Sequence, residues 1–241
     1  MVDLSALRAA NANRFAQAKL TRAPEFAPVA RRLVAAKTRY QPVSARTGVP
    51  WWFIAVVHER ECSQSWRGSL AQGDPWDHVS RNVPRGRGPF KSWEDAAVDA
   101  LVACAPFAAR NKDWSVGGTL TKLEEYNGLG YAAKGRPSPY LWAGTDQYKS
   151  GKYVRDGVYD PNVVDKQLGC VGLILAMMRL DASIKLGAPT ANDNAPPKTV
   201  NQTGQVVTPP HPDSAPATPS ITRPAPGSIG AWIASLFKKA A

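Results

Sequence analysis

Residues 51–57 constrain the fold of this chain more than any other segment. They follow a Gly-Val-Pro sequence at 48–50 and consist only of apolar residues, Trp-Trp-Phe-Ile-Ala-Val-Val. A helix that is apolar on every side is buried inside a protein. We therefore expect this segment to form a central helix around which the rest of a folded domain packs.

The central helix is followed at once by the charged residues His58, Glu59, Arg60 and Glu61. Charged residues at the exit of a buried helix must face a cleft, a partner or solvent. Desolvation beside apolar walls raises the pKa of a carboxylic acid, and such an acid can protonate a glycosidic oxygen near neutral pH. Two residues on a helix are separated by roughly 200° of rotation, so Glu59 and Glu61 point to opposite sides. Periodicity does not say which one faces a cleft, and a surface ion pair is the alternative for either.

The composition divides the chain into three parts. Residues 1–187 form the expected folded domain, with a helical N-terminal segment at 1–40 included. Residues 188–227 are dense in Pro, Ala and Thr and have almost no large apolar residues, so they predict a disordered linker. Residues 228–241 predict a short amphipathic helix, whose apolar face is formed by Ile229, Trp232, Ile233, Leu236 and Phe237.

Several local signals predict that the domain is mostly α-helical. Residues 1–20 are expected to form a polar helix on the surface. Ser92 and the acidic residues after it resemble a capping box ahead of a helix over 96–104. Asp160 and Pro161 predict the N-cap and first position of a helix over 163–180. The connecting segments are long and rich in Gly, Pro, Trp and Tyr, which is typical of loops that build a binding surface.

Charge and cysteine content limit the classes of function. A net charge of +11 favours polyanionic partners such as nucleic acid, anionic lipid or a bacterial cell wall. Cys62, Cys104 and Cys170 are widely spaced and do not indicate a disulfide framework, so we expect buried or partly buried thiols. Residues 1–20 lack the apolar region of a secretory signal. We therefore expect synthesis in the cytoplasm and, for a cell-wall partner, action on the wall or periplasm after release.

The sequence patterns that are typical of zinc binding and of nucleic-acid binding are not found. His58, Glu61 and His78 are candidate zinc ligands, but neither HExxH nor paired Cys/His spacing occurs. The arginine-rich loop 81–87 is flexible and basic, but the chain has no phosphate-binding loop and no helix-turn-helix pattern. We expect no metal, no cofactor and no nucleic-acid partner.

The segment 49–63 resembles the helix that carries the catalytic glutamate in goose-type lysozymes and lytic transglycosylases. In that superfamily a "Val-Pro … Glu-Ser" helix delivers the acid at its C-terminal end. Glu61, Cys62 and Ser63 stand where the family often has Glu-Ser-Ser or Glu-Ser-Gly. The resemblance implies a lysozyme-like helical domain with a substrate cleft, and it assigns the role of general acid to Glu61.

Two further motifs extend the resemblance. Tyr126-Asn127-Gly128 resembles the "Tyr-Asn-Ala-Gly" turn that lines the cleft, with Gly128 in place of the usual Ala. The stretches 138–142 and 151–154 resemble the region that places a tyrosine beside the acid, which implies this role for Tyr153. The whole run 49–175 is similar to a group of phage and bacterial lysozyme-like proteins.

The resemblance implies a function on peptidoglycan. The expected enzyme is a muramidase that cleaves the β-1,4 bond between N-acetylmuramic acid and N-acetylglucosamine, by hydrolysis or by lytic transglycosylation. A phage endolysin or virion-associated lysin, acting as a monomer, fits the absence of a signal. The alternatives are a non-catalytic wall-binding or structural protein on the same fold, and a glycosidase of the chitinase or chitosanase kind.

Other residues are candidates for contacts with the sugar chain. Flat aromatic faces stack on sugar rings, although the same side chains also pack cores. The expected substrate-binding residues are Trp76, Tyr126, Asn127, Tyr131, Tyr140 and Trp142. Asp74 is a candidate second carboxylate that holds the attacking water, and the alternative for it is an ordinary turn residue between Gly73 and Pro75.

The C-terminal helix gives a testable prediction. Its apolar stripe is too short to be a stable helix alone in water, and Lys238 and Lys239 favour an anionic lipid surface. Deletion of residues 228–241 should lower binding to anionic vesicles and lysis of whole cells, while cleavage of purified peptidoglycan is retained. Trp232→Ala should also lower vesicle binding. Equal vesicle binding by the full-length and truncated chains would contradict the membrane interpretation, and a truncation that lowers the melting temperature would show that the helix packs on its own domain.

Overall fold

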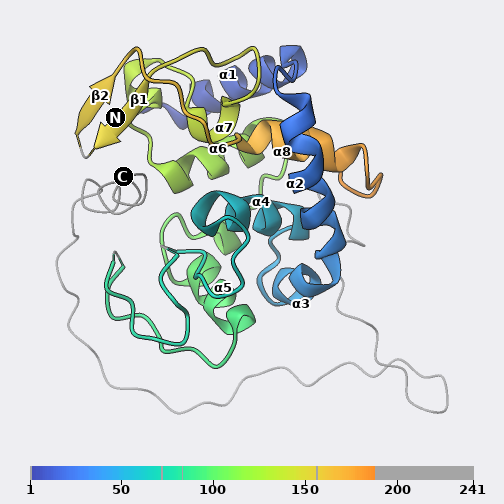
Figure 1. Ribbon diagram of the computed structural model, residues 1–241, viewed down its shortest axis with the longest axis vertical. Coiled ribbons are helices and arrows are strands. Elements are labelled where there is room, and N and C mark those ends of the chain that lie inside the picture. Colours follow the sequence, from blue (N-terminus) through green and yellow to red (C-terminus); the bar gives the residue numbers. More distant parts are fainter. Residues whose placement is uncertain (1, 72, 83, 156, 188–241) are drawn as a thin grey trace.

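The computed structural model describes residues 2–71, 73–82, 84–155 and 157–187, and this part of the chain is mostly helical (Figure 1). The expected linker at 188–227 and C-terminal helix at 228–241 lie outside the described residues. The α-helices are α1 (Leu4–Gln17), α2 (Ala23–Ala35), α3 (Lys37–Thr47), α4 (Trp51–Cys62), α5 (Trp93–Val102), α6 (Val116–Asn127), α7 (Pro139–Trp142) and α8 (Cys170–Met178). Two 3₁₀ turns, η1 (Ala108–Arg110) and η2 (Ala132–Lys134), and two strands, β1 (Lys152–Arg155) and β2 (Val158–Asp160), complete the described elements.

Helix α4 is the centre of the core, as the sequence predicted. Every residue from Trp51 to His58 is buried, and the helix packs against α2, α3 and α8. Figure 1 shows it in the middle of the molecule, with α1 and the two strands on one side and α3 and α5 on the other. The helix ends where Ser63 takes a left-handed conformation, with φ of 53°. Its last turn, which carries Glu61, is therefore fixed by the packing of the entire core.

Helix α1 is the polar surface helix expected for the N-terminus. Asp3 caps it by accepting hydrogen bonds from the backbone of Ser5 and Ala6, and the helix packs against α6. Its one buried residue, Asn11, donates to Glu124 Oε2 at 3.2 Å and to Thr121 Oγ1 at 3.4 Å on α6. A buried carboxyl and a buried amide thus join the two helices.

The predicted cap of α5 is confirmed. The Ser92 hydroxyl oxygen accepts a hydrogen bond from the backbone N–H of Asp95 at 3.1 Å. The first turn of α5 also contacts α3 through two ion pairs, Arg39 with Glu94 at 2.8 Å and Arg46 with Asp95 at 2.9 Å. These pairs hold α3 and α5 together at the edge of the core.

The helix predicted over 163–180 is wrong in its first half, because α8 begins only at Cys170. Asp160 accepts a hydrogen bond from Asn162 N–H in a local turn and does not cap a helix. Backbone carbonyls of the following segment bond distant parts of the chain instead: that of Val163 accepts from Gly151, and that of Leu168 from Arg60. These tertiary hydrogen bonds replace the helical ones, and Val164 is exposed.

A small antiparallel hairpin is an element that the sequence did not predict. Strand β1 pairs with β2 so that Tyr153 lies opposite Tyr159, and the register shifts between Tyr153 and Arg155. The Tyr153 ring meets Tyr159 and Tyr131 edge-on, with ring centroids 5.4 Å and 5.1 Å away. This aromatic cluster attaches the hairpin to the loop that follows α6.

The burial of the three cysteines is as expected: Cys104 and Cys170 are buried and Cys62 is partly buried. Within the described residues, no helix combines the length and the apolar character needed to cross a membrane.

The α1–α6 contact gives a prediction about stability. Burial raises the pKa of Glu124 to about 7, against the opposing effects of the Asn11 hydrogen bond and the Arg14 charge. The folded state therefore keeps its proton where the unfolded state, with a pKa near 4.5, has lost it. Stability falls as pH rises from 4.5 through 7. Glu124→Gln should match the wild type at pH 5 and exceed its free energy of unfolding at pH 8, by on the order of 3 kcal/mol.

Urea unfolding at the two pH values measures this difference. Glu25→Gln is the matched control, because Glu25 is fully exposed and its hydrogen bond with Arg22 lowers its pKa, which places its titration below pH 4.5. An equal difference between wild type and Glu124→Gln at pH 5 and pH 8 would contradict the prediction.

Candidate active site around Glu61

Glu61 lies at the C-terminal end of α4, and its carboxyl is held from another part of the chain. The residue is 6% exposed. The Tyr140 hydroxyl on α7 donates a hydrogen bond to Glu61 Oε1 at 2.9 Å. Tyr140 is itself buried, and both its burial and the neighbouring charge of Glu61 raise its pKa, so the phenol keeps its proton and acts as a donor. A buried carboxyl with a fixed donor is the most strongly positioned acidic group at this end of α4.

The two glutamates of α4 face opposite sides, as their spacing requires. Glu59 points toward α2, where Arg32 Nη2 lies 3.3 Å from its Oε2. Burial raises the pKa of Glu59, while the charges of Arg32 and Arg60 oppose that rise. Glu59 therefore forms an ion pair with α2, and Glu61 faces the aromatic side.

His58 fixes the turn that ends α4. Its Nε2 lies 2.9 Å from the Ser65 carbonyl, which can only accept, so Nε2 carries the proton. Its Nδ1 then accepts from the Tyr40 hydroxyl at 2.9 Å. Trp66 and Trp93 stack around the ring with centroids 4.7 Å away, and burial lowers the His58 pKa to about 4. His58 is thus a neutral structural residue directly before the charged end of the helix.

The second motif of the sequence, at the end of α6, lies close to Glu61. Burial and then the charge of Glu61 raise the pKa of the Tyr126 phenol. The next residue, Asn127, donates from Nδ2 to Ser138 Oγ at 3.3 Å, and Ser138 is the N-cap position of α7. The end of α6 therefore connects to the short helix that carries Tyr140.

Most of the aromatic residues predicted to contact sugar are buried in this structure. Trp142 is 0% and Tyr126 1% exposed, and Tyr131 and Tyr140 are also buried. A ring without accessible surface has no face to offer a sugar. Trp76 and Asn127 remain partly exposed. Trp76 is oriented by a hydrogen bond from its Nε1 to the Trp66 carbonyl oxygen at 2.8 Å.

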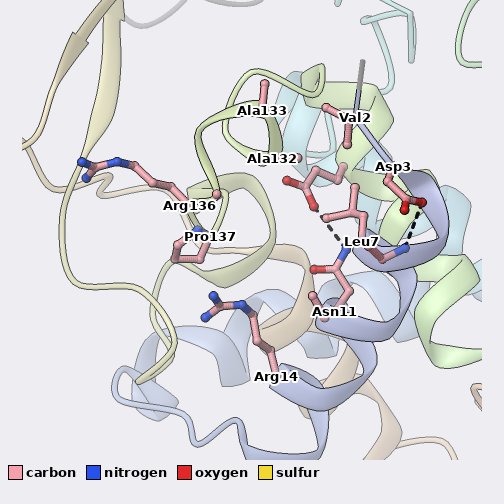
Figure 2. Close-up of a pocket in the computed structure, with 13 residues that line it drawn as sticks. Val2, Asp3, Leu7, Asn11, Arg14, Ala132, Ala133, Arg136 and Pro137 are labelled. Atoms are coloured by element: carbon pink, nitrogen blue, oxygen red, sulfur yellow. Dashed lines mark hydrogen bonds between the residues drawn. The ribbon is translucent and has the colours of Figure 1, made fainter.

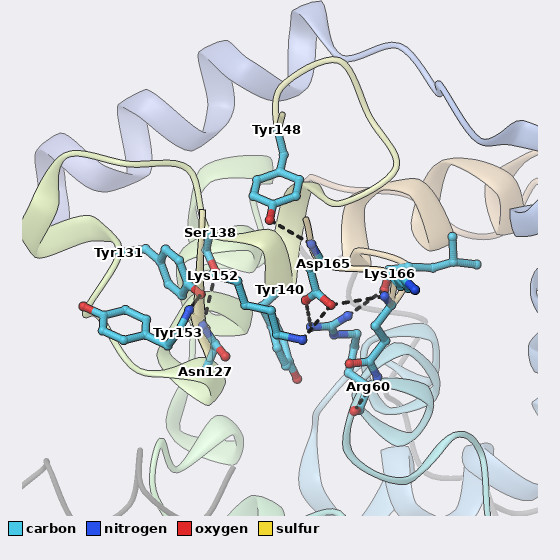
Figure 3. Close-up of polar contacts among 12 residues, drawn as sticks. Arg60, Asn127, Tyr131, Ser138, Tyr140, Tyr148, Lys152, Tyr153, Asp165 and Lys166 are labelled. Carbon is cyan, nitrogen blue, oxygen red and sulfur yellow. Dashed lines mark hydrogen bonds and ion pairs between the residues drawn. The ribbon is translucent and has the colours of Figure 1, made fainter. Parts of the chain in front are cut away.

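The resemblance assigned the tyrosine beside the acid to Tyr153, but the tyrosine hydrogen-bonded to Glu61 here is Tyr140. Tyr153 lies on β1, where its backbone N–H donates to the Tyr131 hydroxyl at 3.0 Å. In Figure 3 its own hydroxyl points away from Tyr140. The ring lies over Gly130, so that a side chain added there would come within 3.3 Å of the Tyr153 hydroxyl oxygen. The hydrogen bond to Glu61 that the resemblance led us to expect from Tyr153 is observed from Tyr140.

Asp74 uses its carboxylate to hold a loop together. Its Oδ2 accepts from the backbone N–H groups of Arg81 and Asn82 at 2.8 Å and 3.0 Å, and its Oδ1 accepts from Asn82 Nδ2 at 2.6 Å. Three hydrogen bonds within one loop support the turn-residue alternative and not the water-holding role.

Sequence reasoning missed a cation directly behind the acid. Arg60 is buried, and its guanidinium lies over the Tyr140 ring, 4.5 Å from the ring centroid (Figure 3). Its partner is Asp165, with Nη2 and Oδ2 3.8 Å apart. The position of Arg60 between Glu59 and Glu61 was a signal that it lies near the candidate site, but no local pattern in the sequence links it to Asp165.

A second buried carboxyl, Glu124, was also missed. It lies at a cavity of about 530 Å³ between α1 and the loop after α6, whose lining includes Leu7, Arg14 and Arg136 (Figure 2). Glu61 is not among the lining residues of this cavity. Glu124 has the helix-joining contact with Asn11 described above, so Glu61 is the stronger candidate for chemistry.

Neither a metal site nor a known relative adds to this picture. Across the described ranges, no group of three or more His, Cys, Asp or Glu side chains is arranged to hold a metal ion. A scan against protein-family models finds no match, and searches of curated proteins and of solved structures find none either. The family resemblance therefore rests on the sequence motifs.

The Tyr140–Glu61 hydrogen bond predicts a loss of stability in Tyr140→Phe. Removal of the hydroxyl leaves a buried carboxyl without this donor, which costs about 1–3 kcal/mol. Tyr159→Phe is the matched control, since it removes a phenol whose hydrogen bond partner, Arg136, is exposed. Urea unfolding measures both variants. A loss in Tyr140→Phe no larger than that in Tyr159→Phe would show that the hydroxyl does not hold the carboxyl.

Proposed function

We propose that this protein is a peptidoglycan-degrading muramidase with Glu61 as its general acid. The bond cleaved is the β-1,4 linkage between N-acetylmuramic acid and N-acetylglucosamine. The observation that carries the proposal is the carboxyl of Glu61: it is almost completely buried at the end of an apolar helix and is hydrogen-bonded by Tyr140. The sequence motifs around Glu61 and Tyr126 support the same assignment.

The chemistry follows from the environment of this carboxyl. Glycosidic cleavage needs an acid that keeps its proton near neutral pH and delivers it to the leaving oxygen. The Tyr140 hydroxyl fixes the direction of the carboxyl group, which keeps the proton aimed along one line. In hydrolysis, water then attacks the sugar carbon. In transglycosylation the muramoyl 6-hydroxyl attacks, and Glu61 takes up its proton.

Because most of the aromatic side chains near Glu61 are buried, we propose sugar contacts only for partly exposed residues. We assign sugar contacts to Trp76 and Asn127, which are partly exposed, and not to Trp142, which is fully buried. A lysozyme-like cleft is proposed on the aromatic side of the end of α4, where Tyr126 and Tyr140 approach Glu61. The net charge of +11 suits a wall polymer that carries carboxylates and phosphates. A role as a phage endolysin or virion-associated lysin, with access to the wall after release, is part of the same proposal.

Variants in which a single carboxyl is replaced by an amide test the proposal. Glu61→Gln should keep the fold and lower the rate of peptidoglycan cleavage on the order of 10²-fold or more, because an amide cannot donate the proton. Glu59→Gln is the matched control on the same helix and should keep most of the activity. The measurement is the loss of turbidity of purified peptidoglycan, with thermal unfolding to verify the fold of each variant.

Two results would overturn this assignment. An active Glu61→Gln with an inactive Glu59→Gln would place the acid on the other face of α4. A wild-type chain that binds peptidoglycan but releases no fragments would show a non-catalytic wall-binding protein. Mass spectrometry of the fragments separates hydrolysis, which leaves reducing ends, from transglycosylation, which leaves 1,6-anhydro ends.

A further inference from the structure

We infer that Arg60 and Asp165 form a buried charged support that positions Tyr140 against Glu61 and sets the pH range in which Glu61 acts. This inference rests on the proposed function, because it assigns positioning residues to the same site. Both are positioning residues: Arg60 orients Tyr140, and Asp165 orients Arg60.

The contacts form a continuous chain to the acid. The Arg60 guanidinium lies 4.5 Å from the centroid of the Tyr140 ring, and the hydroxyl of that ring donates to Glu61 Oε1 at 2.9 Å. The Arg60 and Asp165 side chains are 5% and 6% exposed. Arg60 Nη1 also donates to the Leu168 carbonyl oxygen at 3.0 Å. The guanidinium is therefore held in place on both sides while its face covers the ring (Figure 3).

Asp165 is itself fixed by groups from other elements. Lys152 Nζ on β1 lies 3.1 Å from its Oδ1, and Gln167 N–H donates to the same oxygen at 3.2 Å. The backbone N–H of Asp165 donates to the Tyr148 hydroxyl at 3.0 Å. The hairpin and the 163–168 segment thus hold the anion that holds Arg60.

Arg60 leaves one polar atom unsatisfied. Among the residues that the structure describes, its buried Nε has no hydrogen-bond partner. Buried polar atoms without a partner are rare and need an explanation. Two attractions hold the guanidinium in this position although its Nε is unsatisfied. A cation over an aromatic ring is stabilised by the ring quadrupole, and the guanidinium also pairs with Asp165.

The charge of Arg60 gives the support a second effect. The charge of Glu61 acts on Tyr126 on α6, Tyr140 on α7 and Cys170 on α8. The positive charge of Arg60 on α4 acts on the last two of these groups, which places this cation in the same surroundings. A cation near a buried carboxyl favours its ionised form, so removal of Arg60 makes the proton of Glu61 harder to lose.

Kinetics of the full-length protein on purified peptidoglycan test the inference. Arg60→Met should lower kcat on the order of 10- to 100-fold, as expected for a displaced acid, with little change in KM. It should also move the alkaline limb of the pH–activity profile upward by about one pH unit or more, because the acid now keeps its proton to higher pH. Arg60→Lys keeps the charge without the planar group, so its alkaline limb should stay in place while kcat recovers only in part.

Two controls separate positioning from general loss of structure. Arg46→Met removes an arginine from the more exposed pair with Asp95 and should leave the profile unchanged. The double variant Arg60→Met with Asp165→Asn removes both buried charges together, so neither is left buried without the other. It should fold and show a smaller upward shift of the alkaline limb, because the loss of the Asp165 anion opposes the loss of the Arg60 cation. A folded variant of either kind that keeps both the kcat and the pH–activity profile of the wild type would overturn the inference.

A stability cycle tests the same contact without any activity. The urea midpoints of Arg60→Met, Tyr140→Leu and the combination of these two substitutions should be non-additive, because Tyr140→Leu removes the ring that Arg60 covers. Additive shifts would overturn the positioning role. Failure of the proposed function looks different: the wild type then fails to cleave peptidoglycan, or Glu61→Gln remains active, while the coupling between Arg60 and Tyr140 is still measured.

Discussion

The burial of α4 is the constraint on which the rest of the described structure depends, because the helix is apolar along most of its length and charged at its end. Each charged or polar group there needs a partner from a different element. Arg32 on α2 pairs with Glu59, Tyr40 on α3 bonds His58, and Tyr140 on α7 bonds Glu61. Completion of these contacts brings α2, α3 and α7 to one end of the core, so the requirements of a single helix end organise the candidate site.

Local signals explain which parts of the fold were predictable. The central helix followed from an uninterrupted apolar segment, and the start of α5 followed from Ser92, since both depend on residues close in sequence. The segment before α8 was mispredicted because Asp160 and Pro161 are equally compatible with a turn. Its outcome was decided by hydrogen bonds that the carbonyls of Val163 and Leu168 accept from Gly151 and Arg60, and no local pattern predicts these bonds.

The candidate site also has features that local sequence signals predicted and features that they did not. The sequence motif selected Glu61, and the structure adds a buried carboxyl with a donor. Composition could not show which tyrosine bonds Glu61, so the hydrogen bond from Tyr140 was not predicted. It also could not separate an aromatic residue that faces a cleft from one in the core, as the full burial of Trp142 shows. The Arg60–Asp165 pair joins residues far apart in sequence and was beyond any reading of local pattern.

Glu61 and Glu124, two of the buried carboxyls among the described residues, show why burial alone does not identify an acid with a function. Glu124 is as buried as Glu61, and its pKa of about 7 suits proton transfer near neutral pH. Its donor is the side-chain amide of Asn11, which joins two helices, and no motif of the sequence surrounds it. Glu61 has a phenol donor whose ring is covered by a buried guanidinium, and that guanidinium is fixed in turn by Asp165. A carboxyl that only joins two helices needs one partner, whereas an acid that must present its proton in a set direction needs its partner to be held as well. The second layer of support behind Tyr140 is the feature that distinguishes Glu61 from Glu124.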